Sequence, residues 1–390
     1  MSNFSAAYPK IGYLYQIRYS LYSTLKSKDQ NLKVYLESLD DIVTITDTNN
    51  LIQTKHHINK QANLSNASED FWKTIRVWSE RITSKEISLD NTKFYLVTTQ
   101  RHSKNTIAYY LSQKSYRNTT VALEIIEKTA AETTNKALEI CIKKFHQLSQ
   151  IQKERLVENV YILSESSDIT DCKKDIEEIF RYSVREKYFS SFYERIEGWW
   201  FDKVIEILVS KKCDYIDKNE LRNKISNLNE EFHEDSLPID FLELSTDHDS
   251  IQNDKLFIRK IEKIGLRDIL IKKAMIDYLK AFNQRGKWIR DELLHLNELL
   301  LYEKKLFDEW ERFYYNKFDE DELNDMSHKE KKSIGKDIYE HVMNCQKIKI
   351  RPKVNEEYIM RGSYHMLADK EKKSVYWYPE PDDITLSEDL

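Results

Sequence analysis

The sequence predicts an α/β N-terminal domain with a mixed sheet, followed by a mostly α-helical C-terminal domain. Short β-branched runs alternate with amphipathic helical patterns as far as residue 165, and long apolar periodicities follow. A length of 390 residues favours two domains over one. Because the chain has only 6 Gly and 5 Pro, we expect long helices with few sharp turns. We therefore place the two domains at residues 1–165 and 166–390.

The first domain is expected to follow the order α-β-β-β-α-β-α-β. Apolar residues at helical spacing indicate its helices, and runs rich in β-branched and aromatic residues indicate its strands. The expected elements are a helix over 11–26, strands over 33–37, 41–45 and 51–55, a helix starting after Ser65 or Ser68 and ending near Ile82, a strand over 93–99, a helical stretch over 118–148 and a strand over 160–163.

The second domain is expected to be mainly helical and to serve partner binding or oligomerisation. A polar stretch over 227–254 indicates a loop or an interface segment. Beyond residue 347 the pattern changes, which predicts a small terminal element with one or two strands. The expected helices cover 175–193, 201–211, 256–283 and 286–315.

Charge is distributed unequally along the chain. Residues 1–165 carry 22 Lys+Arg against 17 Asp+Glu, or +5, and the remainder carries 39 against 49, or −10, which together give the net charge of −5. A basic N-terminal half suits a polyanion, and an acidic C-terminal half suits protein partners. An ordinary solvated surface would account for the same numbers.

Several classes of function are disfavoured. No Gly-rich phosphate loop is present, which argues against an ATPase, and neither a Ser-His-Asp elbow nor a Cys/His zinc pattern occurs. The four cysteines are scattered and are expected to be reduced, which is consistent with the cytoplasm. No apolar run reaches membrane-spanning length, and the N-terminus lacks a secretion signal, so we expect no membrane association.

The most informative segment is the hairpin predicted over residues 41–55. Side chains alternate along a strand, so Gln53 and Lys55 point to one face, and the hairpin can bring Asp41 alongside them. Asp41 would bind Mg²⁺ or Mn²⁺ directly, with the Gln53 side-chain carbonyl as a second and weaker ligand. Lys55 would contact the scissile phosphate or the attacking water. This set predicts hydrolysis of a phosphodiester.

Other polar residues could assist at the same place. Glu37 ends the preceding strand, where it would reach a second metal or a water, and Gln16 on the first helix would be an outer ligand. Asp40 would point the other way on a regular strand, and a bulge could exchange the two acids. His56 and His57 are adjacent and should point apart, so they should not chelate one ion; His365 is expected to be structural.

Four segments together resemble a known family. They are Gly12–Gln16, Glu37–Asp41, Gln53–His56 and Asp70–Trp78. In this order they resemble the PD-(D/E)xK restriction-endonuclease-like domains of bacterial anti-phage effectors, including those of cyclic-nucleotide-activated and Lamassu-type systems. The resemblance covers about residues 8–165. It assigns the motif's Asp, Glu/Gln and Lys to Asp41, Gln53 and Lys55, and the position on the first helix to Gln16.

Segments of the second half resemble the C-terminal region of ABC-three-component systems; they are Ile196–Ile205, Arg361–Asp369 and Trp377–Pro379. Such a chain works with an SMC-like or ABC ATPase and a small third subunit. The resemblance implies an endonuclease for double-stranded DNA that is held inactive by the ATPase and activated by release and self-association into a homo-oligomer. An inactive adaptor between the ATPase and DNA, or an enzyme that cuts RNA, would use the same sequence features. Trp199 and Trp200 are expected to be core or interface anchors.

Overall fold

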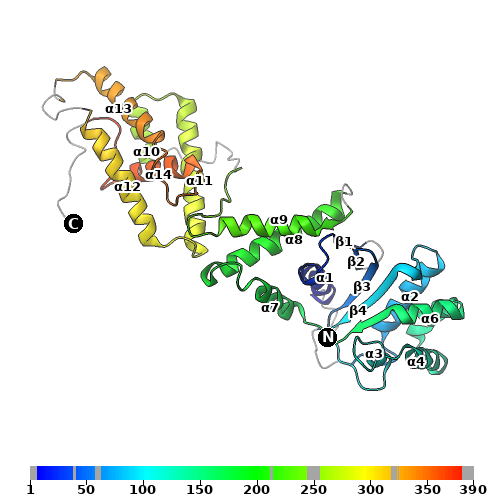
Figure 1. The fold of residues 1–390 in the computed structure, drawn as a ribbon. Helices are drawn as coiled ribbons and strands as arrows, with labels where there is room; N and C mark the ends of the chain where they lie inside the picture. The colour runs from blue at the N-terminus through cyan, green and yellow to red at the C-terminus, as the bar shows by residue number, and fades with distance from the viewer. Residues whose placement is uncertain are drawn as a thin grey trace, which may run out of the picture. The chain divides into compact units, whose positions relative to one another are not determined.

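The structure is a computed structural model that describes residues 7–37, 41–57, 63–210, 214–243, 255–317, 323 and 325–379. It divides into two compact units (Figure 1). The first comprises residues 1–183 and 192–226, and the second comprises 184–191 and 227–390. A sheet with helices characterises the first unit, and helices make up most of the second, which confirms the predicted fold class at this level. The first unit extends past residue 165, the boundary expected from the sequence.

The first unit contains a six-stranded mixed sheet in the order β5-β4-β3-β2-β1-β6. Strands β1, β2 and β3 form an antiparallel meander, β4 and β5 run parallel to β3, and β6 pairs antiparallel with β1. The predicted strands all form, within one or two residues of the expected bounds. The strands are β1 Lys33–Leu36, β2 Ile42–Ile45, β3 Asn49–Lys55, β4 Thr92–Thr98, β5 Val160–Leu163 and β6 Ile216–Asp217.

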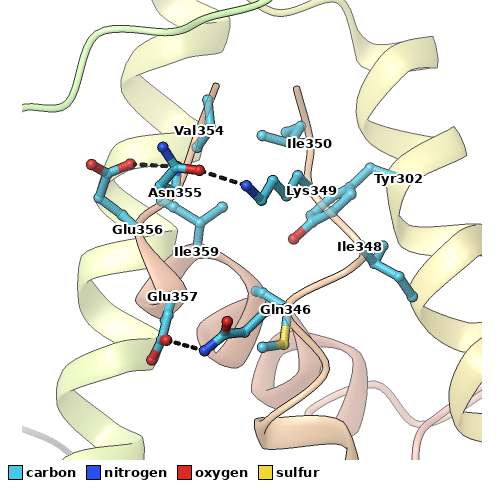
Figure 2. Close-up of a pocket in the computed structure, with 11 residues that line it drawn as sticks. Tyr302, Gln346, Ile348, Lys349, Ile350, Val354, Asn355, Glu356, Glu357 and Ile359 are labelled. Atoms are coloured by element: carbon cyan, nitrogen blue, oxygen red, sulfur yellow. Dashed lines mark hydrogen bonds between the residues drawn. The ribbon is translucent and has the colours of Figure 1, made fainter. Parts of the chain in front are cut away.

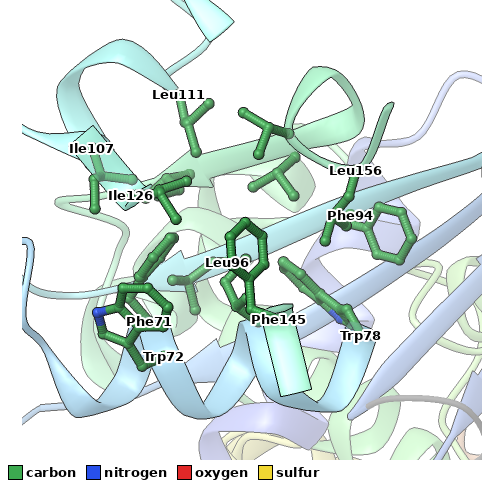
Figure 3. Close-up of a cluster of buried hydrophobic side chains, with 14 of the residues drawn as sticks. Phe71, Trp72, Trp78, Phe94, Leu96, Ile107, Leu111, Ile126, Phe145 and Leu156 are labelled. Atoms are coloured by element: carbon green, nitrogen blue, oxygen red, sulfur yellow. The ribbon is translucent and has the colours of Figure 1, made fainter. Parts of the chain in front are cut away.

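One face of this sheet carries the hydrophobic core of the first unit (Figure 3). Helix α2 (Glu69–Thr83) buries Phe71, Ile75 and Trp78, which recur at helical spacing and therefore lie on one side of the helix. They pack with β4 residues such as Phe94, whose ring lies 5.0 Å from that of Trp78. Truncating such a buried aromatic costs about 3–5 kcal/mol of stability, so this cluster fixes the sheet on which the site is built.

Helix α1 (Ala7–Lys26) contacts β3 and α7 (Ile169–Phe180). From α8 (Phe189–Ser210), the Trp200 indole N–H donates to Ser20 Oγ at 2.9 Å. Trp200 is fully buried, which confirms its prediction as a core anchor. These contacts fix α1 in place, and with it any side chain that α1 directs toward the sheet.

Several helix boundaries differ from the prediction. The stretch 118–148 is divided into α4 (Thr119–Glu132) and α5 (Glu139–His146), because the chain turns at Thr133–Asn135. Helix α6 (Gln150–Asn159) was not expected. It begins with a capping box in which the side chains of Ser149 and Gln152 each accept a backbone N–H.

The second unit is built around one central helix. Helix α14 contacts each of the other four helices that follow residue 255. At its closest crossing, a Cβ added at Gly362 would lie 2.2 Å from the backbone oxygen of Asp277 and 2.4 Å from Ala281 Cβ. The helices are α9 Lys218–Glu231, which spans the division between the units, and then α10 Leu256–Lys263, α11 Asp268–Arg290, α12 Leu296–Tyr315, α13 His328–Met343 and α14 Glu357–Ala368.

The expected terminal strands are not found in the described residues after 347, where Glu357–Ala368 forms α14 instead. His365 on this helix is fully buried, and its ring lies 5.2 Å from that of Phe257. Burial and the nearby Arg361 charge lower the pKa of His365 to about 3, so the ring is neutral. It fills the core of the second unit, as a structural histidine would. Part of the polar stretch 227–254 lies outside the described residues.

None of the helices in the described part of the chain combines the length and apolar character that a membrane span requires.

Candidate active site

The predicted site residues lie at one edge of the sheet. Leu36 pairs with Ile42, and Ile42 pairs with Ile52, so the next row of the register holds Glu37, Asp41 and Gln53. The Glu37 N–H continues this register by donating to the Asp41 carbonyl oxygen at 3.1 Å. The hairpin therefore pairs the backbone positions of Asp41 and Gln53 across β2 and β3. Asp40 lies outside the described residues.

Asp41 is fixed by the strand that carries the Gln-x-Lys sequence. Its Oδ2 accepts hydrogen bonds from the backbone N–H and the hydroxyl of Thr54, at 2.8 and 2.9 Å. Thr54 is buried and lies between Gln53 and Lys55. Hydrogen bonds to an ionised acceptor are worth about 1.5–3 kcal/mol, so these two hold the Asp41 carboxylate against β3. The middle residue of the motif is thus a functional position that the sequence treated as a spacer.

Gln16 supports the site through its amide nitrogen. Nε2 donates to Glu37 Oε1 at 2.9 Å and to the Asp41 carbonyl oxygen at 2.6 Å, and the side chain is buried. Glu37 itself has a φ of 52°, a left-handed conformation that few residues other than glycine adopt. The amide of Gln16 therefore stabilises the turn between β1 and β2 and positions both acids. We assign Gln16 a positioning role.

The pKa of Tyr13 indicates that negative charge is concentrated at this turn. Burial raises the pKa of the Tyr13 phenol, and the charges of Glu37 and Asp41 and a hydrogen bond with Glu37 raise it further. Sequence reasoning missed Tyr13, because its proximity depends on how α1 docks against the hairpin. The turn thus combines two carboxylates close to the end of β3.

Lys55 ends β3 and is paired in the register with Thr98 of β4. Its charge contributes to the environment of Asp70 on α2. Burial acts to raise the pKa of Asp70, but a hydrogen bond with His57 and the charges of His57, Lys55 and Lys73 outweigh it and lower that pKa. His57 Nε2 lies 2.6 Å from Asp70 Oδ2. The Lys55 charge is therefore close enough to the His57–Asp70 pair to help lower the pKa of Asp70.

The two adjacent histidines diverge, as predicted. The His56 ring lies 4.8 Å from that of Tyr15 on α1, whereas His57 reaches Asp70 on α2. They cannot bind one ion together. The His57–Asp70 pair was not predicted, because it requires α2 to start next to the end of β3.

A metal ion at this edge of the sheet would have to be bound by oxygen atoms. Among the described residues, no three His, Cys, Asp or Glu side chains gather as a metal group. The Asp41 and Glu37 carboxylates and the Gln53 amide are nevertheless donors of the type that Mg²⁺ prefers, and Mg²⁺ retains several water ligands in proteins. The residues present fit this ion in chemical type, with water completing its coordination.

Hollows of about 340–670 Å³ lie elsewhere in the described residues, and none of them is lined by Asp41, Gln53 or Lys55. A cavity of about 150 Å³ lies in the second unit (Figure 2), below the usual range for a small-molecule site. Its polar side chains pair with one another: Gln346 donates to Glu357 at 2.5 Å, and Lys349 donates to Asn355 at 2.5 Å. We therefore place the candidate site at the sheet edge.

Part of the second unit matches a known protein family. Residues 257–384 match the family model described as C-terminal domain 7 of the ABC-three component (ABC-3C) systems. The match indicates a protein of an ABC-three-component defence system. It includes α14 and the Arg361–Asp369 segment, whose Gly362 permits the close crossing with α11. No curated protein sequence matches this chain.

Solved structures of the Acinetobacter baumannii Cap4 SAVED/CARF-domain containing receptor are similar at a low level. The structure of that receptor with the cyclic trinucleotide 3'3'3'-cAAA gives a TM-score of 0.34 at 14% identity. The match covers 70% of this chain and 59% of the receptor. The structure of the receptor with 2'3'3'-cAAA gives a TM-score of 0.34 at 13% identity, and the match covers 70% of this chain and 66% of the receptor. The chain thus spans less than two thirds of these receptors, and the TM-scores are too low to establish a common fold.

We expect Thr54→Val to impair the activity of the site without unfolding the chain. Valine keeps the shape and the backbone N–H donor but removes the hydroxyl that binds Asp41. A hydrogen bond to a charged group is worth about 1.5–3 kcal/mol, so its removal corresponds to a fall of roughly 10- to 100-fold in the kcat/KM of any reaction that depends on the Asp41 carboxylate. Thr44→Val, at a buried position two residues into β2, is the matched control. Equal losses in both variants would contradict a special role for Thr54.

The Asp70–His57 pair predicts a pH dependence of stability. Because the folded-state pKa of Asp70 lies below its ordinary value of 3.8, its contribution is fully present above that value and is lost as pH falls through the folded pKa. Asp70→Asn should therefore lower the free energy of unfolding at neutral pH and have progressively less effect below about pH 4. Urea unfolding of both proteins across this range measures the difference, and a pH-independent difference would contradict the assignment.

Proposed function

We propose that the first unit is a Mg²⁺- or Mn²⁺-dependent DNA endonuclease with its site at Asp41, Gln53 and Lys55. The observation that carries this proposal is the anchoring of Asp41 to Thr54, the residue between the other two. It joins the carboxylate to the strand that carries Gln53 and Lys55, which supports a site shared by these three residues. The order α1-β1-β2-β3-α2-β4 supports a restriction-endonuclease-like domain, in line with the family resemblance of residues 8–165.

Each residue has a separate task in this proposal. Asp41 and Gln53 would hold the metal, which when bound supplies polarisation of the phosphate and activation of water. Lys55 stabilises the negative charge that develops on the phosphate oxygens. Glu37 orders water at the same edge, and Gln16 keeps Glu37 and the Asp41 backbone in place. These tasks all concern the phosphate and involve no base contacts, so cutting with little sequence preference is expected.

The family match of the second unit supports a role for the chain within a complex. ABC-three-component systems involve an ABC ATPase and further subunits. We infer that the system is of the Lamassu type, that an SMC-like ATPase and a small third subunit hold the nuclease inactive, and that release permits self-association. Cutting both strands of a duplex requires two sites, which a homo-oligomer would provide. Activity should then rise steeply with protein concentration.

A non-catalytic adaptor is the alternative function. The neutral Gln53, where an acid would bind metal more strongly, favours it, as does the lack of a three-member metal group among the described residues. Such a chain would link the ATPase to DNA without cutting.

Metal removal tests the proposal. The full chain, with and without its ATPase partner, should cut plasmid DNA in Mg²⁺ or Mn²⁺ and stop when EDTA is added. Cleavage restored by Mn²⁺ after chelation would support a metal nuclease. DNA that stays intact in every metal and at every protein concentration, with the partner present, would contradict it and favour the adaptor.

A further inference from the structure

A basic and aromatic surface, formed by residues 101–117, lies beside the site edge. From Asn91 to Leu123 the chain contains no Asp or Glu, although acids outnumber bases overall. The same 91–123 stretch contains five cations: Lys93, Arg101, Lys104, Lys114 and Arg117. Such a bias in a chain of net charge −5 marks a local surface that favours an anion.

This surface begins where β4 ends and is tied to the site edge. Thr99 Oγ1 donates to the His57 carbonyl oxygen at 3.0 Å and accepts the His57 N–H at 2.9 Å. Two residues further on, the Leu64 N–H donates to the Arg101 carbonyl oxygen at 2.7 Å. Because Lys55 is the register partner of Thr98, the surface starts at Arg101, three residues along the chain from the β4 position beside Lys55.

Aromatic rings are stacked within this surface. The rings of Tyr109 and Tyr116 are nearly parallel, at 4.0 Å and 6°, and both side chains are half-buried. Tyr110 meets Tyr109 edge-on at 5.1 Å, and its hydroxyl donates to Asn105 at 3.0 Å. The Asn118 N–H donates to the Tyr110 carbonyl oxygen at 3.0 Å, which closes the loop that carries Tyr116. The tyrosines are thus held in fixed positions rather than buried in the core.

The cations around the rings are accessible. Lys104 and Lys114 are exposed, and neither forms an ion pair with any residue that the structure describes. Arg101 is 64% exposed and lies 3.5 Å from Glu165, an exposed pair of little energetic value. Lys104 and Lys114 are thus unpaired cations in the segment that carries the stacked tyrosines, whereas Arg101 lines a hollow with Glu165 and Asp171.

We propose that the 101–117 surface binds a nucleic-acid strand and leads it to the site edge. Lys104 and Lys114 contact phosphates, and the Tyr109–Tyr116 stack accepts an unpaired base. Single-stranded nucleic acid is held in this way, by cations that follow the backbone and aromatic rings on which bases stack. The proposal rests on the proposed function for the identity of the site, but the binding it describes does not require cleavage.

Binding of fluorescein-labelled single-stranded DNA to the full chain in EDTA tests this inference, because EDTA keeps the DNA intact. The variant Lys104→Gln/Lys114→Gln should bind more weakly, and the slope of log affinity against log salt should fall by roughly 1.4, about 0.7 for each phosphate that is no longer neutralised. Tyr116→Leu should weaken single-strand binding about tenfold while leaving the salt slope unchanged. Lys128→Gln/Lys136→Gln, two exposed lysines of the same unit, is the control with equal charge change.

The outcomes separate this inference from the nuclease proposal. Loss of binding only in Lys104→Gln/Lys114→Gln supports the surface even if the wild-type chain cuts no DNA, a result that would contradict the nuclease alone. Equal weakening by both lysine pairs, or no binding of single-stranded DNA by the wild type, would overturn the surface. Unchanged affinity in Tyr116→Leu would overturn the base-stacking part. The exposed lysine variants cannot disturb the core, so a folding defect would not confuse the result.

Discussion

Lys55→Ala should reduce DNA cleavage by at least about 100-fold while the chain remains folded and able to bind DNA. The loss follows from removing the cation that ends the Gln-x-Lys strand, where negative charge develops during hydrolysis. Lys55 is half-buried, and the variant leaves the Asp41–Thr54 hydrogen bonds in place. The measurement is the initial rate of plasmid nicking in Mn²⁺ at saturating DNA.

The matched control is Lys93→Ala. Lys93 lies on β4 near its start, at the opposite end of the strand from Thr98, the register partner of Lys55. Both variants remove one lysine from the same sheet, so general electrostatic weakening affects them equally. Cleavage by Lys55→Ala at the rate of Lys93→Ala would show that Lys55 has no catalytic role.

Gly362→Ala should strongly destabilise the second unit. Its Cβ would lie 2.2 Å from the Asp277 carbonyl oxygen and 2.4 Å from Ala281 Cβ, and the first of these is backbone that cannot rotate away. Helices α11 and α14 would have to separate, at a cost of about 3 kcal/mol. Urea unfolding of the full chain, followed by tryptophan fluorescence, measures the change.

Gly198→Ala provides the control of opposite sign. Gly198 lies within α8, and no atom lies within 4 Å of an added Cβ. Alanine there should raise stability by up to about 1 kcal/mol, because glycine is the poorer helix former. A Gly362→Ala protein as stable as the wild type would contradict the close crossing, and with it the structural reason for the Arg361–Asp369 segment.

The elements that the sequence predicted best are those with a strong local signal. The β-branched run Ile42–Ile45 and the run Val160–Leu163 became strands within one residue of the expected bounds. Helix limits were poorer, because apolar periodicity continues through short breaks. Gly265, with a φ of 71°, divides the helix expected over 256–283, although a single glycine does not show from sequence that it adopts this conformation. Gly286, expected at a break, lies inside α11.

Some missed features had a sequence signal, but the helical pattern of the preceding stretch obscured it. Ser149 and Gln152 are spaced as a capping box, which is a recognisable helix start, but the preceding helical stretch appeared to continue as far as residue 148. The predicted terminal strands failed for another reason. Aromatic residues such as Tyr358 and Tyr364 have β propensity, yet tertiary packing against α11 places them in α14.

The strand register at the candidate site was predictable from the sequence, but the contacts that hold its side chains were not. Strand alternation and the hairpin register sufficed to bring Asp41 beside Gln53. The anchoring by Thr54 depends on the turn of the Asp41 side chain, and the contacts of Gln16 depend on how α1 docks. Neither leaves a pattern in the sequence, because the first depends on a side-chain conformation and the second on the packing of a helix against the hairpin.

The most direct test of the central claim is the rate of plasmid cleavage by the full chain with Asp41→Ala, beside Asp47→Ala. Asp47 is exposed in the turn between β2 and β3, at the other end of the hairpin. A nuclease centred on Asp41 predicts metal-dependent cleavage by the wild type and Asp47→Ala, and none by Asp41→Ala. Equal, metal-dependent cleavage by Asp41→Ala and the wild type would contradict the site.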